Sequence, residues 1–154
     1  MVPEEHNKKT IEPANEWDVE TLYEFLESVR AKTNNALRMR SEEEIRKNIR
    51  SFVTIKQDGN IIACGEIFQT EDATTLELWA LAVDEEYKWN WLSEKIIEQA
   101  EFVAKKAERN LIIVTNNPVL EKKLRERGYE LSSSEEYNWR KQKSPTKNVY
   151  VKYL

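Results

Sequence analysis

The chain has 154 residues, a length that suits one hydrophobic core, and its 40% hydrophobic and 34% charged residues exclude a compositionally disordered protein. Its net charge of -4 provides no global positive field, so we expect no nucleic-acid partner. Its apolar runs fall short of the roughly 20 residues that span a bilayer, and no signal segment opens the chain, so we expect a cytoplasmic protein with no membrane partner.

The start of the chain predicts a tail, a strand and a helix. Residues 1–9 are polar and charged, so we expect a disordered tail, followed by a single domain over residues 10–154. Residues 10–13 suit a short strand. Asn15 or Asp18 can cap the helix that follows, because apolar residues then recur at helical spacing: Val19, Leu22, Leu26 and Val29.

A second helix and a hairpin come next. Ser41 and Glu44 form an S-x-x-E pattern, which predicts a helix that starts at Ser41. Two β-rich runs, 51–56 and 61–69, flank the pair Asp58-Gly59, which is typical of hairpin turns. These two runs are predicted to be antiparallel strands.

The second half of the chain predicts a parallel crossover. Residues 74–83 are nearly continuous in apolar side chains, as expected for a central strand covered on both faces. A helix over residues 93–109 leads to a strand over residues 111–115, and such a connection normally joins parallel neighbours.

The remaining segments complete an α/β order. A helix is predicted over Pro118–Arg127, with Gly128 just past its end. Residues 132–146 are predicted to form a long polar loop, and residues 148–153 a closing strand. The order is β-α-α-β-β-β-α-β-α-β.

A single cysteine and a single histidine restrict the chemistry. Cys64 cannot form an internal disulfide, and with His6 as the only histidine neither a zinc cage nor a Cys/His catalytic pair is expected. Cys64 lies in the apolar run 61–68, so we expect a buried thiol rather than a reactive one. We therefore expect no metal.

Several short segments resemble one family in one order along the chain. They are Ile11–Ala14, Arg40–Glu44, Ile61–Cys64, Leu81–Val83, Leu124–Tyr129, Tyr137-Asn138 and Thr146–Leu154. With the element order, they resemble the GNAT N-acetyltransferases, and in particular the catalytic domain of the amino-acid N-acetyltransferases that make N-acetylglutamate. The resemblance implies the acyl-CoA N-acyltransferase fold: a mixed, mostly antiparallel sheet with a central splayed parallel pair, flanked by helices.

The resemblance also implies an acetyl-CoA site beside the splayed pair. Pantetheine would bond to the backbone of Leu81, Ala82 and Val83. The loop that opens the next helix would hold the pyrophosphate through backbone N–H groups and the helix dipole; it comprises Lys88, Trp89, Asn90, Trp91, Leu92 and Ser93. Asn116 and Asn117 stand where family members contact the CoA arm, although Asn-Asn-Pro equally supplies a helix cap.

This loop departs from the family pattern V-x-x-x-x-R/Q-x-x-G-x-G/A. Lys88 takes the Arg/Gln position, but Trp91 and Ser93 take the glycine positions. A tryptophan at a required left-handed position would cost about 1–2 kcal/mol. Trp89 and Trp91 are either apolar plugs between the splayed strands, the interpretation that we favour, or rings that stack on adenine or pantetheine while Lys88 supplies the charge.

Acetyl transfer to an amine needs a base, and Glu77 is the candidate. It lies near where histone-acetylating GNAT members carry a glutamate base, and a carboxylate among apolar residues can have a raised pKa. Alternation along the strand puts Glu77, Trp79, Leu81 and Val83 on one face. The alternative is a salt-bridged or edge-exposed carboxylate. Glu66 is a weaker candidate for the base and suits a structural role better.

The sequence gives weaker signals for the general acid that protonates the leaving thiolate and for the residues that contact the acceptor. Many GNAT members have a tyrosine acid where this chain has Leu124; Tyr129 and Tyr137 are candidate substitutes, but packing explains each of them better. Arg40, Asn138 and Lys147 fall in segments that resemble those around the amino-acid pocket, although a solvated surface position explains each of them more simply. The oligomeric state stays open, a homodimer included.

Two functions follow from the sequence. The first is an N-acetyltransferase that transfers acetyl from acetyl-CoA to a small amine or amino acid. The second is a catalytically degenerate GNAT-fold domain that acts as a binding or regulatory module without turnover, which the missing glycines support.

Overall fold

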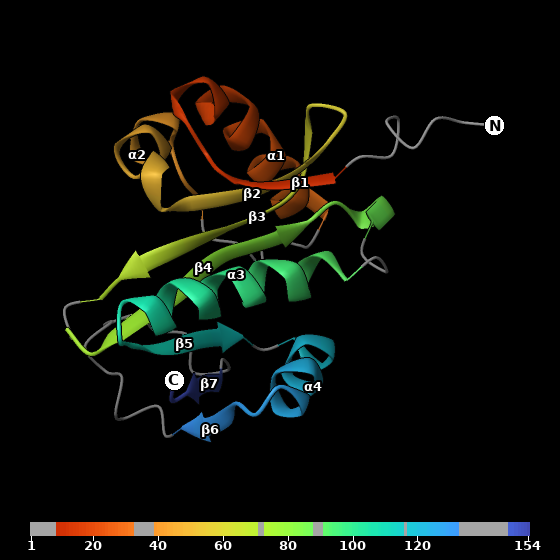
Figure 1. Ribbon diagram of the computed structural model, residues 1–154. Coiled ribbons are helices and arrows are strands. Elements are labelled where there is room, and N and C mark those ends of the chain that lie inside the picture. The colour runs from red at the N-terminus through yellow and green to blue at the C-terminus, as the bar shows by residue number, and fades with distance from the viewer. Residues whose placement is uncertain (1–8, 33–38, 71–72, 88–90, 116, 133–147) are drawn as a thin grey trace. The chain divides into compact units, whose positions relative to one another are not determined.

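The computed structural model describes residues 9–32, 39–70, 73–87, 91–115, 117–132 and 148–154 (Figure 1). The strands are β1 (Lys9–Pro13), β2 (Phe52–Gln57), β3 (Asn60–Gln69), β4 (Thr75–Val83), β5 (Asn110–Thr115), β6 (Glu130–Ser132) and β7 (Asn148–Lys152). The α-helices are α1 (Val19–Lys32), α2 (Glu42–Lys47), α3 (Leu92–Lys106) and α4 (Pro118–Glu126), and the short 3₁₀ helices are η2 (Glu16–Asp18), η3 (Ile49–Ser51) and η4 (Glu85–Tyr87).

The strands form a mixed sheet flanked by helices. Their order is β1-β2-β3-β4-β5-β7-β6. β4 and β5 are parallel, whereas β1 with β2, β2 with β3, β5 with β7 and β6 with β7 are antiparallel. The predicted fold class and the predicted parallel pair are confirmed.

The chain divides into two compact units, residues 1–67 with 80–99 and residues 68–79 with 100–154. In the first unit, β2 and β3 are joined by Asp58 and Gly59, with φ of +52° and +83°. Two consecutive positive φ angles are the requirement of a type I′ turn, which matches the twist of a hairpin. The predicted hairpin is confirmed.

The helices of the first unit begin at side-chain caps. The Asn15 side chain accepts a hydrogen bond from the Trp17 N–H and the Asp18 side chain accepts one from the Asn15 N–H, so the two residues form a capping box at η2, directly before α1. The Ser41 hydroxyl accepts from the Glu44 N–H at 3.1 Å and starts α2. The apolar face predicted for α1 is buried along its length, and α1 and α2 lie side by side in Figure 1.

In the second unit, β5 supplies much of the core. Leu111, Ile112 and Ile113 are buried, and β7 pairs with β5 from Leu111↔Lys152 to Thr115↔Asn148. The edge strand β6 is absent from the predicted element order, which places a loop from Ser132 onward. The rest of that predicted loop, together with the predicted tail, lies outside the described residues.

The end of α3 differs from its prediction. The helix was expected to reach Arg109, but it ends at Lys106 because Glu108 takes φ of +57°. The Arg109 N–H then donates to the Ala104 carbonyl at 2.8 Å, the bond that closes a helix with a left-handed residue. At the end of α4, Gly128 takes the left-handed conformation as predicted, with φ of +89°.

None of the helices in the described ranges combines the length and the hydrophobicity that a membrane crossing requires.

Candidate functional site

β4 changes character half-way along its length. Its parallel ladder with β5 runs from Thr75↔Asn110 to Leu78↔Ile113. Ala80 then takes φ of +52°, a left-handed conformation that is typical of a β-bulge when it occurs inside a strand. Simple alternation therefore does not extend across Ala80, and the expectation that Glu77 and Val83 share one face loses its basis.

The second half of β4 is fixed by β3. The Cys64 thiol contacts the Ala80 carbonyl at 3.5 Å, and the Asp84 N–H donates to the Ile62 carbonyl at 2.8 Å. Between these two points Ala82 is buried, whereas Leu81 and Val83 are half-buried. The three residues expected to hold pantetheine thus form an anchored stretch of strand.

A tight turn follows β4. The Asp84 carbonyl accepts from the Tyr87 N–H at 2.8 Å, and the Asp84 carboxylate accepts from the Glu86 N–H at 3.0 Å. Lys88, Trp89 and Asn90, which were expected at the pyrophosphate, lie outside the described residues.

Trp91 stands at the start of α3. Its carbonyl accepts the Lys95 N–H at 3.1 Å, so it occupies the cap position of this helix, and Leu92 and Ser93 form the first turn. Its φ is +57°, the left-handed conformation for which family members use glycine. The side chain is 67% exposed, so the interpretation of Trp91 as a buried plug is wrong.

Glu77 is fully buried in the second unit. Its partner in the register of β5 is Ile112, and its neighbours in β4 are Leu76 and Leu78, all of them buried. Of the two alternatives to a catalytic base, the edge-exposed carboxylate is therefore wrong, and the salt-bridged carboxylate stays open. A carboxyl group in such surroundings lacks most of the hydration that favours its charged form.

Arg40 and Glu66 form a buried ion pair in the first unit. The Arg40 Nε lies 3.5 Å from the Glu66 Oε1, and both side chains are nearly inaccessible. The interpretation of Arg40 as a solvated surface residue is wrong, and Glu66 has the structural partner expected of it. Burial raises the pKa of the nearby Cys64 thiol to about 12, with the Arg40 charge opposing the rise and the Glu66 charge adding to it. The Cys64 thiol is buried as predicted.

These segments match a known family. The acetyltransferase (GNAT) family matches residues 12–131, a span that includes β4, Glu77 and the start of α3. The chain belongs to this family. The resemblance of its short segments to GNAT enzymes is thereby confirmed.

Individual relatives agree with this assignment. An amino-acid acetyltransferase from Pseudomonas fluorescens is 30% identical to this GNAT chain over 136 residues, which cover 88% of the chain and 30% of the relative. The chain therefore spans less than a third of that enzyme.

Solved structures share the GNAT fold. N-acetylglutamate synthase from Neisseria gonorrhoeae, complexed with coenzyme A and N-acetyl-glutamate, superimposes with a TM-score of 0.81 at 19% identity. The match covers 96% of this chain and 35% of the synthase chain. The PaiA N-acetyltransferase from Thermoplasma acidophilum, in complex with coenzyme A, superimposes with a TM-score of 0.76 at 17% identity. The match covers 96% of this chain and 99% of the PaiA chain.

The other residues expected at the GNAT site either have structural roles or lie outside the described residues. The Asn117 side chain accepts from the Val119 and Leu120 N–H groups and caps α4, as the simpler interpretation held. The Tyr129 hydroxyl donates to Glu101 at 2.8 Å, which gives it a structural partner. Leu124 is fully buried. Asn116, Tyr137, Asn138 and Lys147 lie outside the described residues.

Sequence reasoning did not anticipate the bulge at Ala80 or the pairing of Arg40 with Glu66. Alanine gives no local signal for a positive φ, because its side chain disfavours that conformation. The ion pair joins two segments that are far apart in sequence, so nothing in either segment alone could indicate it.

Proposed function

We propose that this GNAT domain transfers the acetyl group of acetyl-CoA to the amine of an amino acid or a similar small amine. The observation that carries the proposal is the geometry of β4. Its ladder with β5 ends at Leu78, but the strand continues to Val83 and is held there by β3. The backbone of Leu81–Val83 therefore makes no ladder hydrogen bonds with β5. An extended ligand such as pantetheine needs backbone groups of this kind as partners.

The residues at the start of α3 fit a diphosphate arm. The first-turn N–H groups of a helix carry partial positive charge, and α3 is long enough for its dipole to contribute. Trp91 already has the left-handed φ for which glycine is the usual residue. Because Trp91 is exposed, we propose its ring as a stacking surface for adenine and Lys88 as a countercharge.

Bound acetyl-CoA supplies a thioester, whose carbonyl carbon is attacked by the amine to give an amide and a free thiol. The chain must first remove a proton from the incoming ammonium group, and we propose Glu77 for this step. Burial among apolar strand residues favours proton uptake by a carboxylate, which is the property that a general base needs near neutral pH. We assign no residue to the proton that the leaving thiolate requires.

An amino-acid acceptor is supported by the amino-acid acetyltransferase relative rather than by the geometry. Arg40 is committed to Glu66, so we propose that it supports the site without touching the acceptor. Asn138 and Lys147 remain the proposed acceptor contacts. A soluble domain without a metal or a nucleic-acid partner is sufficient for this chemistry.

Binding of acetyl-CoA tests the cofactor half of the proposal. Acetyl-CoA at 100 times its dissociation constant should stabilise the domain by about 2.7 kcal/mol, which thermal denaturation detects as a raised Tm. Trp91→Gly should keep the φ of the cap without strain and lose any stacking, so a weaker acetyl-CoA affinity in this variant supports the role of the ring. No shift at millimolar acetyl-CoA would contradict the proposal and favour a domain without turnover.

A further inference from the structure

One face of the sheet in the second unit is turned toward helices. The Tyr150 hydroxyl donates to Glu121 of α4 at 3.0 Å, and the Lys152 ammonium donates to Glu101 of α3 at 3.2 Å. Tyr150 and Lys152 therefore point to the same face of β7. Val151 lies between them in this strand, so its side chain points to the opposite face.

Glu77 lies on the face opposite α3 and α4. Val151 stands opposite Ile112 in the register of β5 and β7, and Ile112 stands opposite Glu77 in the register of β4 and β5. Residues opposite each other in register point to the same face of a sheet. Trp79 follows Glu77 by two residues and precedes the bulge at Ala80, so it points to this face as well. The proposed base and Trp79 thus share one face.

Two aromatic rings are stacked on this face. The ring centroids of Phe68 in β3 and Trp79 in β4 are 4.2 Å apart, and the ring planes are inclined by 7°. Both residues are half-buried, so part of the apolar surface of the pair stays accessible. Aromatic rings offer a large apolar area to a partner. The pair provides such an area two residues along β4 from the proposed base.

The pair stands where the ladder between β4 and β5 ends. The last residues in register are Leu78 and Ile113, so Trp79 and Val114 come next along the two strands. Val114 is half-buried, like Trp79. It packs against a cluster with three buried members: Ile112, Val149 and Val151. Apolar side chains from β4, β5 and β7 therefore line this face beyond the ladder.

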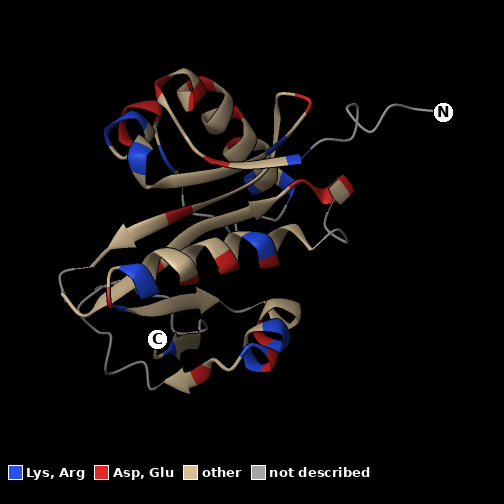
Figure 2. Ribbon diagram, in the orientation of Figure 1, with Lys and Arg blue, Asp and Glu red and all other residues tan. Residues whose placement is uncertain are grey.

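The charges on this face are acidic. Within the described bounds of β4, β5, β6 and β7, Lys152 is the one basic residue, and it points to the helices. Glu130 of β6 stands opposite Val151 in register and so shares the face of Glu77. Figure 2 shows charges of both signs on α4, whereas the β5 arrow is tan. A carboxylate side chain on the acceptor would lose hydration here and gain no cation from these strands.

A cationic side chain on the acceptor fits no better. Glu77 is assigned to the reacting amine in the proposed function. Glu130 is exposed on the edge strand β6, three strands from β4 in the sheet order. Neither carboxylate is thus available to a second cation beside Trp79.

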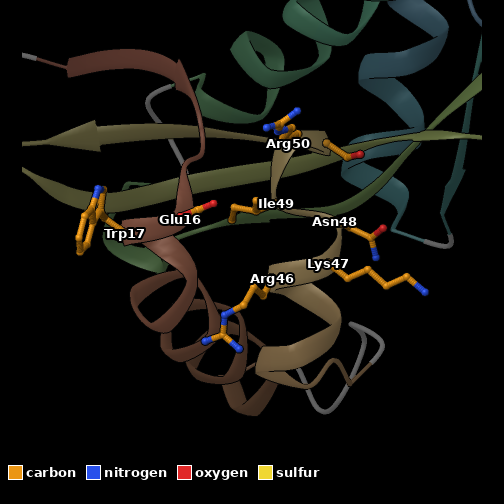
Figure 3. Close-up of a pocket in the computed structure, with 8 residues that line it drawn as sticks. Glu16, Trp17, Arg46, Lys47, Asn48, Ile49 and Arg50 are labelled. Atoms are coloured by element: carbon orange, nitrogen blue, oxygen red, sulfur yellow. The ribbon is translucent and has the colours of Figure 1, made fainter.

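The hollow of the first unit has a different character. It is lined by residues of η2 and of the segment from α2 to β2. In Figure 3 the Trp17 ring and the Arg46 guanidinium point in different directions, so these groups do not meet one ligand. The second unit, in contrast, brings two rings and a buried carboxylate onto one face.

We propose that the acceptor of this GNAT domain is an amino acid with an apolar side chain, of the class of phenylalanine, methionine and leucine. The side chain packs on Trp79 and Val114, with Phe68 holding the indole from behind, while the amine faces Glu77. Asn138 and Lys147 are left for the carboxylate that every amino acid carries. The inference rests on the proposed acetyl transfer and adds the class of acceptor.

Rates of acetyl transfer to single amino acids test the inference. Thiol release by the full chain should be followed at saturating acetyl-CoA with phenylalanine, methionine, leucine, glutamate, aspartate, lysine and glycine. The kcat/KM of at least one of the three apolar amino acids should exceed those of glutamate, aspartate and lysine by about 10-fold or more.

Trp79→Leu tests the packing surface. It should lower the ratio of kcat/KM for phenylalanine to kcat/KM for glycine by about 5-fold or more, because ring-to-ring packing is lost. Both rates are measured on one preparation, so the ratio does not depend on how much of the variant is folded. Phe102→Leu is the matched control, because Phe102 is an exposed ring on α3, and it should leave the ratio unchanged.

The outcomes separate this inference from the proposed function. If glutamate, aspartate or lysine is the best acceptor, acetyl transfer stands and the apolar class is overturned. The same holds if Trp79→Leu slows all acceptors by one factor and leaves the ratio unchanged. If no amino acid is acetylated, the proposed function fails and the inference fails with it.

Discussion

Two acidic side chains of the second unit, Glu101 and Glu77, lie in different elements and differ in burial. Glu101 accepts hydrogen bonds from Arg127, from the Tyr129 hydroxyl at 2.8 Å and from Lys152 at 3.2 Å. Burial alone would raise the pKa of Glu101, but the hydrogen bonds from these donors outweigh it and the pKa is lowered. Glu77 instead lies fully buried in β4, opposite Ile112 in β5.

We propose that Glu101 holds the fold and that the more deeply buried Glu77 acts in catalysis. A carboxylate surrounded by cationic and hydroxyl donors keeps its charge, so it cannot take up a proton at neutral pH. A fully buried carboxyl group has lost the hydration that stabilises its charged form. Replacing each of these two acids shows whether the distinction holds, and Cys64 probes a buried acid of the first unit.

The largest effect is expected for Glu77→Gln. The amide keeps the size of the side chain but cannot accept a proton, and the loss of a general base typically lowers a rate by about 100-fold or more. Steady-state assays of thiol release should show this loss in kcat, while calorimetry shows an unchanged affinity for acetyl-CoA. Turnover equal to that of the unmodified enzyme would remove Glu77 from the mechanism.

Glu101→Gln should reduce stability instead. It replaces a charged acceptor with a neutral one for Arg127, Tyr129 and Lys152, and hydrogen bonds to charged groups contribute about 1.5–3 kcal/mol. Urea denaturation should give a loss of about 2 kcal/mol in the free energy of unfolding, with kcat of the folded enzyme unchanged. Glu98→Gln on the same helix, where Glu98 is half-exposed, is the control and should change stability by less than about 0.5 kcal/mol.

The contribution of Glu101 should also depend on pH. Because its pKa is lower in the folded state than in the unfolded chain, the stabilisation is complete above the unfolded value, near pH 4.3, and is lost as the pH falls through the folded value. The difference in unfolding free energy between the unmodified chain and Glu101→Gln should therefore shrink between about pH 6 and pH 3. A difference that stays constant over this range would show that the charge of Glu101 is not the source of its effect.

The smallest effect concerns Cys64 in the first unit, near the buried acid Glu66. Burial raises the pKa of this thiol to about 12, so almost no thiolate forms at pH 8. A thiol reagent should label the native chain extremely slowly and the urea-unfolded chain at once, as read by mass spectrometry. Rapid labelling of the native chain would mean that the region around Arg40 and Glu66 opens to solvent.

The elements with local signals were predictable from the sequence. Asp58-Gly59 specifies its turn through two positive φ angles, and Ser41 and Asn15 specify helix starts through their own side-chain oxygens. β6 was missed because three residues with an exposed Leu131 give no alternating pattern. The end of α3 was misjudged because a non-glycine residue, Glu108, takes the left-handed conformation that stops the helix.

The site was predictable in its segments but less so in its geometry. Glu77 and the Leu81–Val83 segment follow from the central strand and the family resemblance. Hydrophobicity suggested that Trp91 is buried, but the residue is exposed at the start of α3. The burial of Arg40 depends on Glu66, a partner that only the folded chain brings near.

The central claim is that this domain makes amides from acetyl-CoA and small amines, and product analysis tests it most directly. The full chain should be incubated with acetyl-CoA and each of the common amino acids, and the products examined by mass spectrometry. We predict that at least one amino acid gains a single acetyl group on its amine, and that Glu77→Gln forms this product at a rate lower by about 100-fold or more. No acetylated product from any amino acid or simple amine, despite demonstrated acetyl-CoA binding, would contradict the account.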